Sequence, residues 1–428
     1  MSETDSAGET GRGPGPDRDL APTIGPLVLG QPAHGGFCVA RWDGLVVFVS
    51  GGLPGETVRV EVTERRSNCW FARVLEPLEA SPDRVDHVWP LAAATGVGGA
   101  DLGHVRWGAQ QSWKAAVVAG ALRRIGHLEA AVTVEPAPGD QDRGGLAWRT
   151  RVDFTTDQDG RLAMYAPWSD RLVPVDSMPL AHEDIQAAQL WAETWAPGRR
   201  IALVRASGRP GGGPRLVTVE SDPAENGPDA ATGRVVWERV DRSDRPDLAY
   251  RVDPAGFWQV HRQAPAVLVD AVSSWLGDLT GRTVLDLYCG AGLFTVPLAQ
   301  AVGPTGRVEA VEADRAAVAN ARRNCADWPQ ARVQAGSVAA WLARPTIRSG
   351  PVHDIVLDPP RRGAGRAVIE RMVALQPQRV VYLACDPAAL ARDLAGLIQA
   401  GYRLDRLRAF DLFPMTHHVE TMAALVRA

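Results

Sequence analysis

The feature that most constrains the fold is the stretch from residue 283 to residue 299, which reads as a strand, a turn and a helix. Its first half is apolar and typical of a buried parallel strand, and a helix-compatible segment follows the turn that holds Gly290 and Gly292. Glycine lets backbone amides approach a ligand closely. Because open α/β sheets bind cofactors at this end of a strand, the stretch predicts a cofactor-binding α/β domain.

An acidic residue ends the next expected strand. Residues 308–312 close with Glu312, twenty residues after Gly292, and a carboxylate there can accept hydrogen bonds from the two ribose hydroxyls of an adenosine cofactor. A nicotinamide cofactor site would also combine a glycine turn with a carboxylate at the end of the next strand. The dinucleotide pattern, however, requires a third glycine where this chain has Thr295. Asp286, Tyr288 and the two glycines instead resemble the first motif of class I S-adenosylmethionine methyltransferases.

Length and composition indicate an ordinary globular protein with more than one domain. The chain has 428 residues, of which 45% are hydrophobic and 22% charged. It shows no long apolar run and no secretory signal, so we expect a cytoplasmic protein without a membrane segment. Its five cysteines have no paired spacing, which argues against a disulfide framework. The net charge of −4 does not by itself announce a nucleic-acid partner.

The first eighty residues divide into two parts. Residues 1–22 are polar and rich in Gly and Pro, and we expect them to be disordered. Residues 23–82 carry short β-like runs broken by glycine, which predicts a small closed barrel of the OB type. This segment resembles the TRAM domain, an RNA-binding barrel found on RNA-modifying enzymes. The residues that could contact phosphates or stack on bases are Arg59, Arg65, Arg66 and Trp70; the alternative is a barrel with solvated arginines.

The remainder is expected to form two further domains. Residues 83–250 are predicted to be a central α+β domain that helps to hold the substrate, with a helix over about 107–129 and two or three strands over 146–175. Residues 251–428 are predicted to be the Rossmann-like cofactor domain, an α/β fold that opens with the segment 254–261.

Three later motifs in this domain carry candidate chemistry. Asp358 ends an apolar strand and is followed by two prolines, which fix a rigid turn. Cys385 ends a further strand and is a candidate nucleophile, although a lone cysteine is more often a small core residue. Glu420 lies among apolar neighbours, which would raise its pKa toward that of a usable base; the alternative is a solvated surface acid.

Taken together, four motifs resemble those of the RNA uracil-C5 methyltransferases and occur in the family's order. They begin at Tyr288, Asp358, Cys385 and Phe413. The resemblance implies that Cys385 is the nucleophile and Glu420 the base, and that S-adenosylmethionine is the cofactor. The cofactor contacts that it implies are Gln259, Tyr288, Gly290, Gly292, Glu312 and Asp358.

The implied activity is methylation of C5 of a uridine in structured RNA, with ribosomal RNA favoured over transfer RNA. The specific uridine is not defined by these motifs. Two other functions stay open, namely a methyltransferase that acts on another base or an amino group, and a non-catalytic RNA-binding module with this fold. We expect a monomer without a metal site.

Some relatives in this family carry an iron–sulfur cluster, and this chain is expected to lack one. The positions that match the cluster cysteines are Trp89, Val97, Ala100 and Met178. None of these side chains can replace a thiolate on iron.

Overall fold

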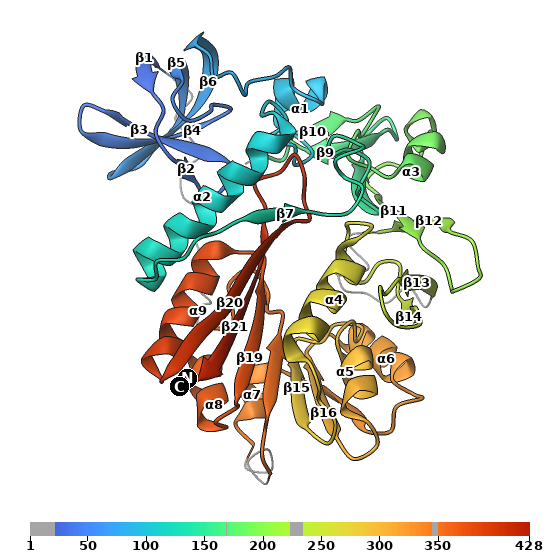
Figure 1. Cartoon of the computed structure of the whole chain (residues 1–428). Helices are drawn as coiled ribbons and strands as arrows, with labels where there is room; N and C mark the ends of the chain where they lie inside the picture. Colours follow the sequence, from blue (N-terminus) through green and yellow to red (C-terminus); the bar gives the residue numbers. More distant parts are fainter. Residues whose placement is uncertain (1–21, 168, 223–233, 345–349) are drawn as a thin grey trace, which may run out of the picture. The chain divides into compact units, whose positions relative to one another are not determined.

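The computed structural model describes residues 22–167, 169–222, 234–344 and 350–428. The chain forms two compact units, residues 1–82 and residues 83–428 (Figure 1), and each is described by itself. The expectation of disorder over residues 1–22 lies, apart from residue 22, outside the described residues.

The first unit is a six-stranded sheet with the order β1-β5-β6-β4-β3-β2. Its strands are β1 (Thr23–Val28), β2 (Pro32–Ala33), β3 (Phe37–Trp42), β4 (Leu45–Ser50), β5 (Thr57–Arg65) and β6 (Cys69–Glu79). Alternate residues of β5 (Val58, Val60 and Val62) point into the core, as the period-2 pattern predicts. Beyond β1, the backbone N–H of Gly30 donates to the carbonyl of Val39 in β3. The sheet therefore curls, so that the segment after β1 lies beside β3, which is near the opposite edge of the sheet.

The second unit contains an eight-stranded sheet with the order β17-β16-β15-β18-β19-β21-β20-β7. The strands are β7 (Val134–Pro136), β15 (Thr283–Leu287), β16 (Arg307–Glu312), β17 (Ala331–Ala335), β18 (Asp354–Leu357), β19 (Arg379–Ala384), β20 (Tyr402–Asp411) and β21 (Glu420–Arg427). The run from β17 to β19 is parallel, and β21 pairs antiparallel with both β19 and β20. The five parallel strands confirm the α/β interpretation of this domain.

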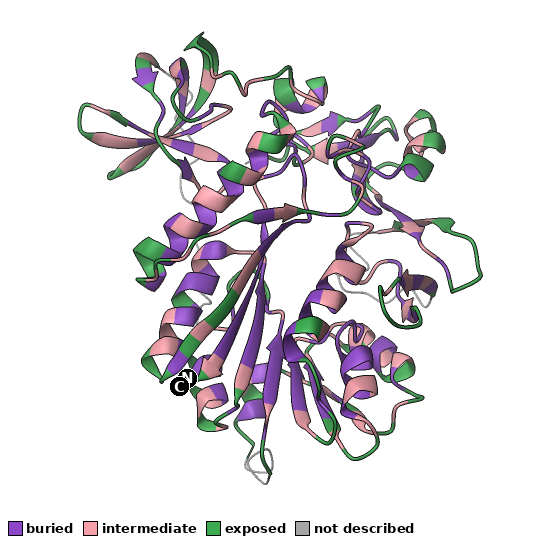
Figure 2. Cartoon of the chain, viewed as in Figure 1, coloured by how far each residue is buried: buried purple, intermediate pink, exposed green. Residues whose placement is uncertain are grey.

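Helices cover both faces of this sheet, and Figure 2 shows most of its strands buried. On one face lie α4 (Ala264–Leu276), α5 (Thr295–Val302) and α6 (Arg315–Asn324); on the other lie α2 (Trp107–Gly126), α7 (Val338–Leu342), α8 (Arg366–Ala374) and α9 (Pro387–Gln399). Successive residues of β15 serve the two faces, because Val284 joins the first core and Leu285 the second.

A smaller β structure occupies the middle of the chain. It comprises a five-stranded sheet, β10-β9-β8-β11-β12, and the hairpin β13–β14. The bounds are β8 (Arg151–Thr156), β9 (Leu162–Tyr165), β10 (Leu172–Pro174), β11 (Arg200–Ala206), β12 (Arg215–Ser221), β13 (Val236–Val240) and β14 (Leu248–Val252), with the helices α1 (Pro90–Thr95) and α3 (Glu183–Ala187) and the 3₁₀ turn η1 (Leu190–Ala192).

The expected helix over 107–129 is α2, and the expected strands over 146–175 are β8, β9 and β10. Two elements from residues 83–250 nevertheless pack with the eight-stranded sheet. Strand β7 pairs with β20, and helix α2 packs in the core that covers one face of the sheet. The division at residue 250 therefore remains a prediction. Among the described residues, no helix has the length and apolar character needed to cross a membrane.

Candidate active site

The predicted site residues gather along one edge of the eight-stranded sheet. Tyr288 follows β15, Glu312 ends β16, Asp358 follows β18 and Cys385 follows β19, so four neighbouring parallel strands deliver them at their carboxyl ends. Glu420 begins β21, which runs in the opposite direction beside β19 and so presents its first residue at the same edge. Motifs spread over more than a hundred residues of sequence thus meet at one edge of the sheet.

The turn after β15 has an unusual backbone conformation. Gly290 and Gly292 have φ angles of 54° and 93°, which glycine adopts at low cost. Tyr288 has φ 64°, a left-handed conformation that is rare for a non-glycine residue and typical of functional turns. A Cβ atom built on Gly290 would meet no described atom within 4 Å. The backbone of the turn is therefore open for a ligand to approach.

Glu312 is oriented by three backbone amides. Its Oε2 accepts a hydrogen bond from Gly290 N at 3.0 Å, and its Oε1 accepts from Ala313 N at 2.6 Å and Asp314 N at 2.8 Å. A carboxylate offers about four lone-pair sites, so capacity remains for a ligand hydroxyl. The residues at this edge thus fit the ribose of an adenosine cofactor.

Thr295, which replaces the third glycine of a dinucleotide site, has a structural role here. Its hydroxyl donates to Asp286 Oδ2 at 2.5 Å inside the core. Burial, together with the charges of Asp358 and Glu312, raises the pKa of Asp286 to about 7.

Gln259 lies in the segment before α4 and is partly exposed. Its side-chain amide has no hydrogen-bond partner among the described residues, which leaves it available to a ligand. Trp258 beside it is buried against Tyr250, with ring centroids 5.2 Å apart, while Phe257 is 75% exposed. The sequence interpretation did not single out Phe257, and its exposure became evident only from the structure.

Cys385 lies near Glu420. Ala384 and Thr421 are the last paired residues of β19 and β21, and Cys385 and Glu420 are the residues next to this pair. The Glu420 carboxylate is close enough to contribute to the raised pKa of Cys385. Asp386 caps α9, because its side chain accepts from Ala389 N at 2.7 Å, and this cap fixes Cys385 at the strand–helix junction.

The surroundings of the Cys385 thiol favour its neutral form. Burial raises its pKa to about 12, with further contributions from the carboxylates of Glu420 and Asp358, while the Arg361 guanidinium acts in the opposite direction. A thiolate at this position therefore needs additional positive charge close by.

Glu420 is 6% exposed, and among the described residues its Oε1 has no hydrogen-bond partner. Burial, followed by repulsion from Asp358, raises its pKa well above the usual value. This is the direction that the apolar neighbours of Glu420 predicted. An oriented, desolvated carboxylate without a partner is suited to accept a proton from a substrate.

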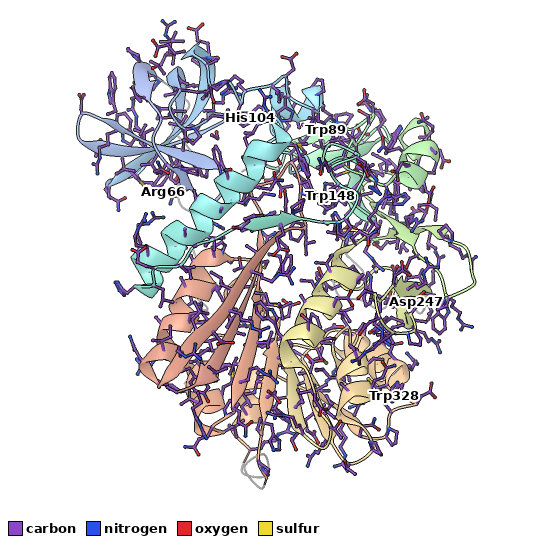
Figure 3. All side chains as sticks on the ribbon, viewed as in Figure 1. Arg66, Trp89, His104, Trp148, Asp247 and Trp328 are labelled. Carbon is purple, nitrogen blue, oxygen red and sulfur yellow. The ribbon has the colours of Figure 1, made fainter. Side chains whose placement is uncertain are left out.

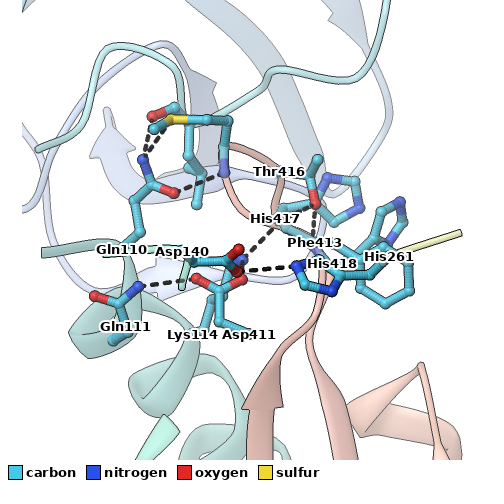
Figure 4. Close-up of polar contacts among 12 residues, drawn as sticks. Gln110, Gln111, Lys114, Asp140, His261, Asp411, Phe413, Thr416, His417 and His418 are labelled. Carbon is cyan, nitrogen blue, oxygen red and sulfur yellow. Dashed lines mark hydrogen bonds and ion pairs between the residues drawn. The ribbon is translucent and has the colours of Figure 1, made fainter. Parts of the chain in front are cut away.

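The loop between β20 and β21, residues 412–419, is anchored by a buried ion pair (Figure 4). Lys114 of α2 donates to Asp411 Oδ1 at 2.5 Å and to Phe413 O at 3.0 Å, and both charged side chains are fully buried. Gln110 of the same helix accepts from Met415 N at 2.8 Å. Lys114 is the only lysine in the chain, and this signal for the contact was present in the sequence but was not used in its interpretation.

A second anchor reaches the same loop from the segment after α1. The Asp101 carboxylate accepts from His417 N at 3.2 Å and lies 2.6 Å from His417 Nδ1. The backbone N–H of Leu102 donates to Met415 O at 2.9 Å. Residues 412–419 are therefore held from two directions, which fixes the position of Glu420 at their end.

The four positions that match cluster cysteines are apolar and buried. Trp89, Ala100 and Met178 belong to one core cluster that also includes Trp148 (Figure 3), and Val97 belongs to a smaller one. The larger cluster extends to Met415 of the loop. In the described ranges, no group of three His, Cys, Asp or Glu side chains is arranged to hold a metal ion.

An α/β sheet with an open glycine turn, an acid at the tip of the second strand and a cysteine–glutamate pair at the same edge defines a class I S-adenosylmethionine-dependent methyltransferase. Three protein-family models match parts of this chain, and their descriptions agree with this class. Residues 27–75 match the TRAM domain, residues 263–381 the methyltransferase small domain, and residues 342–428 the family described as tRNA (Uracil-5-)-methyltransferase.

Related proteins are similar to this chain over almost its whole length. An uncharacterized RNA methyltransferase of Bifidobacterium longum is 40% identical over 419 residues, covering 92% of this chain and 95% of the relative. A protein of Shewanella named 23S rRNA (uracil(1939)-C(5))-methyltransferase RlmD is 28% identical and covers 93% of this chain and 94% of the relative. The chain belongs to the TRAM-containing, S-adenosylmethionine-dependent RNA uracil-C5 methyltransferase family.

The fold has a solved counterpart. The crystal structure of the Pyrococcus abyssi tRNA (uracil-54, C5)-methyltransferase in complex with S-adenosyl-L-homocysteine matches with a TM-score of 0.65 and 24% identity. It covers 93% of this chain and 99% of the other. The three-part arrangement of an N-terminal β unit, a central β structure and a Rossmann-like domain is thus shared.

Proposed function

We propose that the protein methylates C5 of a uridine in structured RNA through a covalent adduct to Cys385, with Glu420 as the base. The observation that supports this proposal is the register of β19 and β21, whose last pair, Ala384 and Thr421, adjoins Cys385 and Glu420 at the carboxyl end of β19. The two residues come from motifs 35 positions apart. A core cysteine and a surface acid would not require this arrangement.

The chemistry requires such a pair. C5 of a uracil ring is too weakly nucleophilic to take a methyl group unaided. Addition of the Cys385 thiolate to C6 makes C5 enolate-like, so that C5 could take a methyl group whose bond to the donor's sulfonium sulfur would break with its electron pair left on that sulfur. Glu420 then removes the C5 proton, the C6–S bond breaks with its electron pair returning to sulfur, and the aromatic ring is restored.

The cofactor would be held by the residues that line the sheet edge. Glu312 and Asp358 offer polar side chains at this edge, Gly290 offers an open backbone in the turn that also holds Tyr288 and Gly292, and Gln259, from the segment before α4, offers a further amide. S-adenosylmethionine, when bound, supplies the electrophilic methyl group and a positive charge. The high pKa of Cys385 supports the need for that charge, since a neighbouring cation lowers a thiol pKa.

We propose ribosomal RNA rather than transfer RNA as the substrate. The support is that the Shewanella relative, at 28% identity, is named for a uracil of 23S rRNA, whereas the tRNA enzyme of Pyrococcus abyssi is 24% identical. The target uridine must be unpaired or flipped out of a helix to reach Cys385.

One experiment tests both the activity and the substrate. The protein would be incubated with labelled S-adenosylmethionine and either ribosomal or transfer RNA from a strain that lacks the enzyme, and the RNA digested to nucleosides. We expect 5-methyluridine from ribosomal RNA and none with Cys385→Ala. Label in an amino-methylated nucleoside would refute the reaction, and 5-methyluridine from transfer RNA alone would refute the substrate.

We further propose that the protein acts as a cytoplasmic monomer and carries no iron–sulfur cluster. The cluster proposal is supported by Trp89, Ala100 and Met178, which are at most 3% exposed and pack on one another. A Cβ atom on Gly98 would lie 2.0 Å from the Trp89 ring, so the indole fills this region. Stoichiometric iron in anaerobically purified protein would contradict the proposal.

A further inference from the structure

A polar cavity of about 250 Å³ lies in the second unit, away from the cysteine–glutamate pair in sequence. Segments from five parts of the chain meet at it: the loop before β8, the start of α3, the end of β11, the strand β13 and the start of α4. The side chains that matter for its chemistry are Arg143, His182, Arg205, Ser207, Arg239 and Arg262.

Four arginines at one cavity are only partly neutralised. Glu183 faces both Arg143, at 3.5 Å, and Arg262. Two further carboxylates each hold one arginine, since Asp184 lies 3.0 Å from Arg205 and Asp241 lies 2.7 Å from Arg239. Three carboxylates thus oppose four guanidinium groups, which leaves one positive charge in excess.

The histidine at the cavity does not add to this charge. Burial and the positive charges of Arg262 and Arg205 lower the pKa of His182 to about 4, so its ring is neutral at pH 7. Its Nδ1 accepts from Asp184 N, which caps α3. The arginines and the carboxylates that pair with them therefore set the charge of the cavity.

Several guanidinium donors at the cavity are unused. Arg205 makes its hydrogen bond to Asp184 through Nε, and within the described residues its two terminal nitrogens have no hydrogen-bond partner. The Nε of Arg262 is buried and has no partner among those residues. A buried donor without an acceptor is unfavourable, so the cavity favours a ligand that brings acceptor oxygens.

We propose that this cavity binds a phosphate of the RNA backbone and so positions the substrate strand. Arginine forks match phosphate oxygens in charge and geometry. The net charge of the chain is −4, so its overall field does not attract RNA and local arginine clusters must supply the phosphate contacts. The inference rests on the proposed function in taking RNA as the ligand.

Arg205→Gln tests the proposal, and Arg200→Gln is its matched control. Both arginines lie on β11 and each pairs with one aspartate, Asp184 or Asp153, but only Arg205 lines the cavity. Affinity for a fluorescein-labelled single-stranded RNA of mixed sequence would be measured over a range of KCl concentrations. We expect Arg205→Gln to bind about tenfold more weakly, with a salt slope smaller by about 0.7–1, and Arg200→Gln to match the wild type.

A double variant, Arg205→Gln/Arg239→Gln, tests whether Arg239 compensates for the loss of the Arg205 charge. Wild-type affinity and salt slope in both variants would overturn the inference. Inorganic phosphate is the second probe: protection of the wild type alone against thermal unfolding, with RNA affinity equal in all variants, would also overturn it, because the cavity would then be a small-anion site.

The outcome is separable from that of the proposed function. At saturating RNA, Arg205→Gln should form 5-methyluridine at the wild-type maximal rate, with a raised KM. RNA affinity that is the same in the wild type and in both cavity variants, with 5-methyluridine formation by the wild type intact, would refute this inference alone. Cavity-dependent binding without any 5-methyluridine from the wild type would support the inference and refute the proposed function.

Discussion

Asp286 sets a pH dependence of stability at the scale of a single residue. Its pKa rises from 3.8 to about 7 on folding, so between these values the folded state binds more protons than the unfolded state. Stability is therefore fully present below about pH 4 and is lost as pH rises through about 7. Asn cannot ionise and keeps an acceptor for Thr295.

We expect Asp286→Asn to abolish this loss, which amounts to at most about 4 kcal/mol in the wild type. Urea denaturation at pH 4 and pH 8 would measure it. If the difference between the two pH values is as large in the variant as in the wild type, Asp286 is not the group responsible.

The repulsion between Asp358 and Glu420 predicts a pH-dependent rate. Glu420 must be ionised to accept the C5 proton, and its pKa is raised by burial and by Asp358. Turnover should therefore fall as pH drops through a value well above that of a free glutamate. The apparent pKa belongs to the coupled pair.

Asp358→Asn removes the neighbouring charge and should shift this acidic limb to lower pH. The rate of 5-methyluridine formation at saturating S-adenosylmethionine and RNA would be followed against pH. An unchanged limb in the variant would mean that the two carboxylates do not interact during the reaction.

At the scale of elements, the Lys114–Asp411 pair connects α2 to the strand that leads into the loop 412–419. Loss of one partner of a buried ion pair leaves an uncompensated charge and costs about 3–5 kcal/mol. We expect Lys114→Met to be destabilised by this amount, and Lys114→Met/Asp411→Leu to recover most of the stability.

The activity of the same two variants distinguishes a role of Lys114 in stability from a role in positioning the loop 412–419. Lys114 also donates to Phe413 O in the loop, so both variants should lose at least about tenfold in turnover, even where stability returns. Urea denaturation and nucleoside assays on both proteins would measure this. Full activity in the double variant would show that Lys114 does not position the loop.

The sequence predicted the sheet and the residues at its edge better than it predicted the elements that pack against them, namely β7, α2 and its Lys114. Val284 and Leu285 mark a two-sided buried strand, and the tips of such strands converge by topology, so Glu312, Asp358 and Cys385 could be placed together in advance. The assignment of β7 and α2 could not, because the three-residue strand β7 has no periodicity to read and pairs with β20, far along the chain. The role of Lys114 likewise depends on long-range contacts, with Asp411 and Phe413.

At the scale of the whole molecule, we propose that the first unit, which matches the TRAM domain, makes a further contact with RNA. Of its predicted contact residues, Arg59 and Arg66 pair with the carboxylates of Glu76 and Glu64, whereas Arg65 lies 4.9 Å above the Trp70 ring. Stacking of a base on an aromatic ring contributes about 1–3 kcal/mol.

Trp70→Ala should therefore weaken RNA binding by about fivefold to a hundredfold and leave S-adenosylhomocysteine binding unchanged. Trp42→Ala, on β3 of the same unit, is the control and should bind RNA as the wild type does. Fluorescence anisotropy with RNA and calorimetry with S-adenosylhomocysteine would measure the two affinities. Equal RNA affinity for both variants would remove Trp70 from the RNA contacts.

The protein–RNA adduct tests the central claim most directly. Glu420→Gln keeps the nucleophile but loses the base, which should slow release of the C5 proton by about 10²–10⁴. With S-adenosylmethionine and substrate RNA, this variant should accumulate a methylated protein–RNA band that survives a denaturing gel, and Cys385→Ala should give neither band nor 5-methyluridine. Normal turnover by Glu420→Gln, or methylation of uridine by Cys385→Ala, would contradict the account.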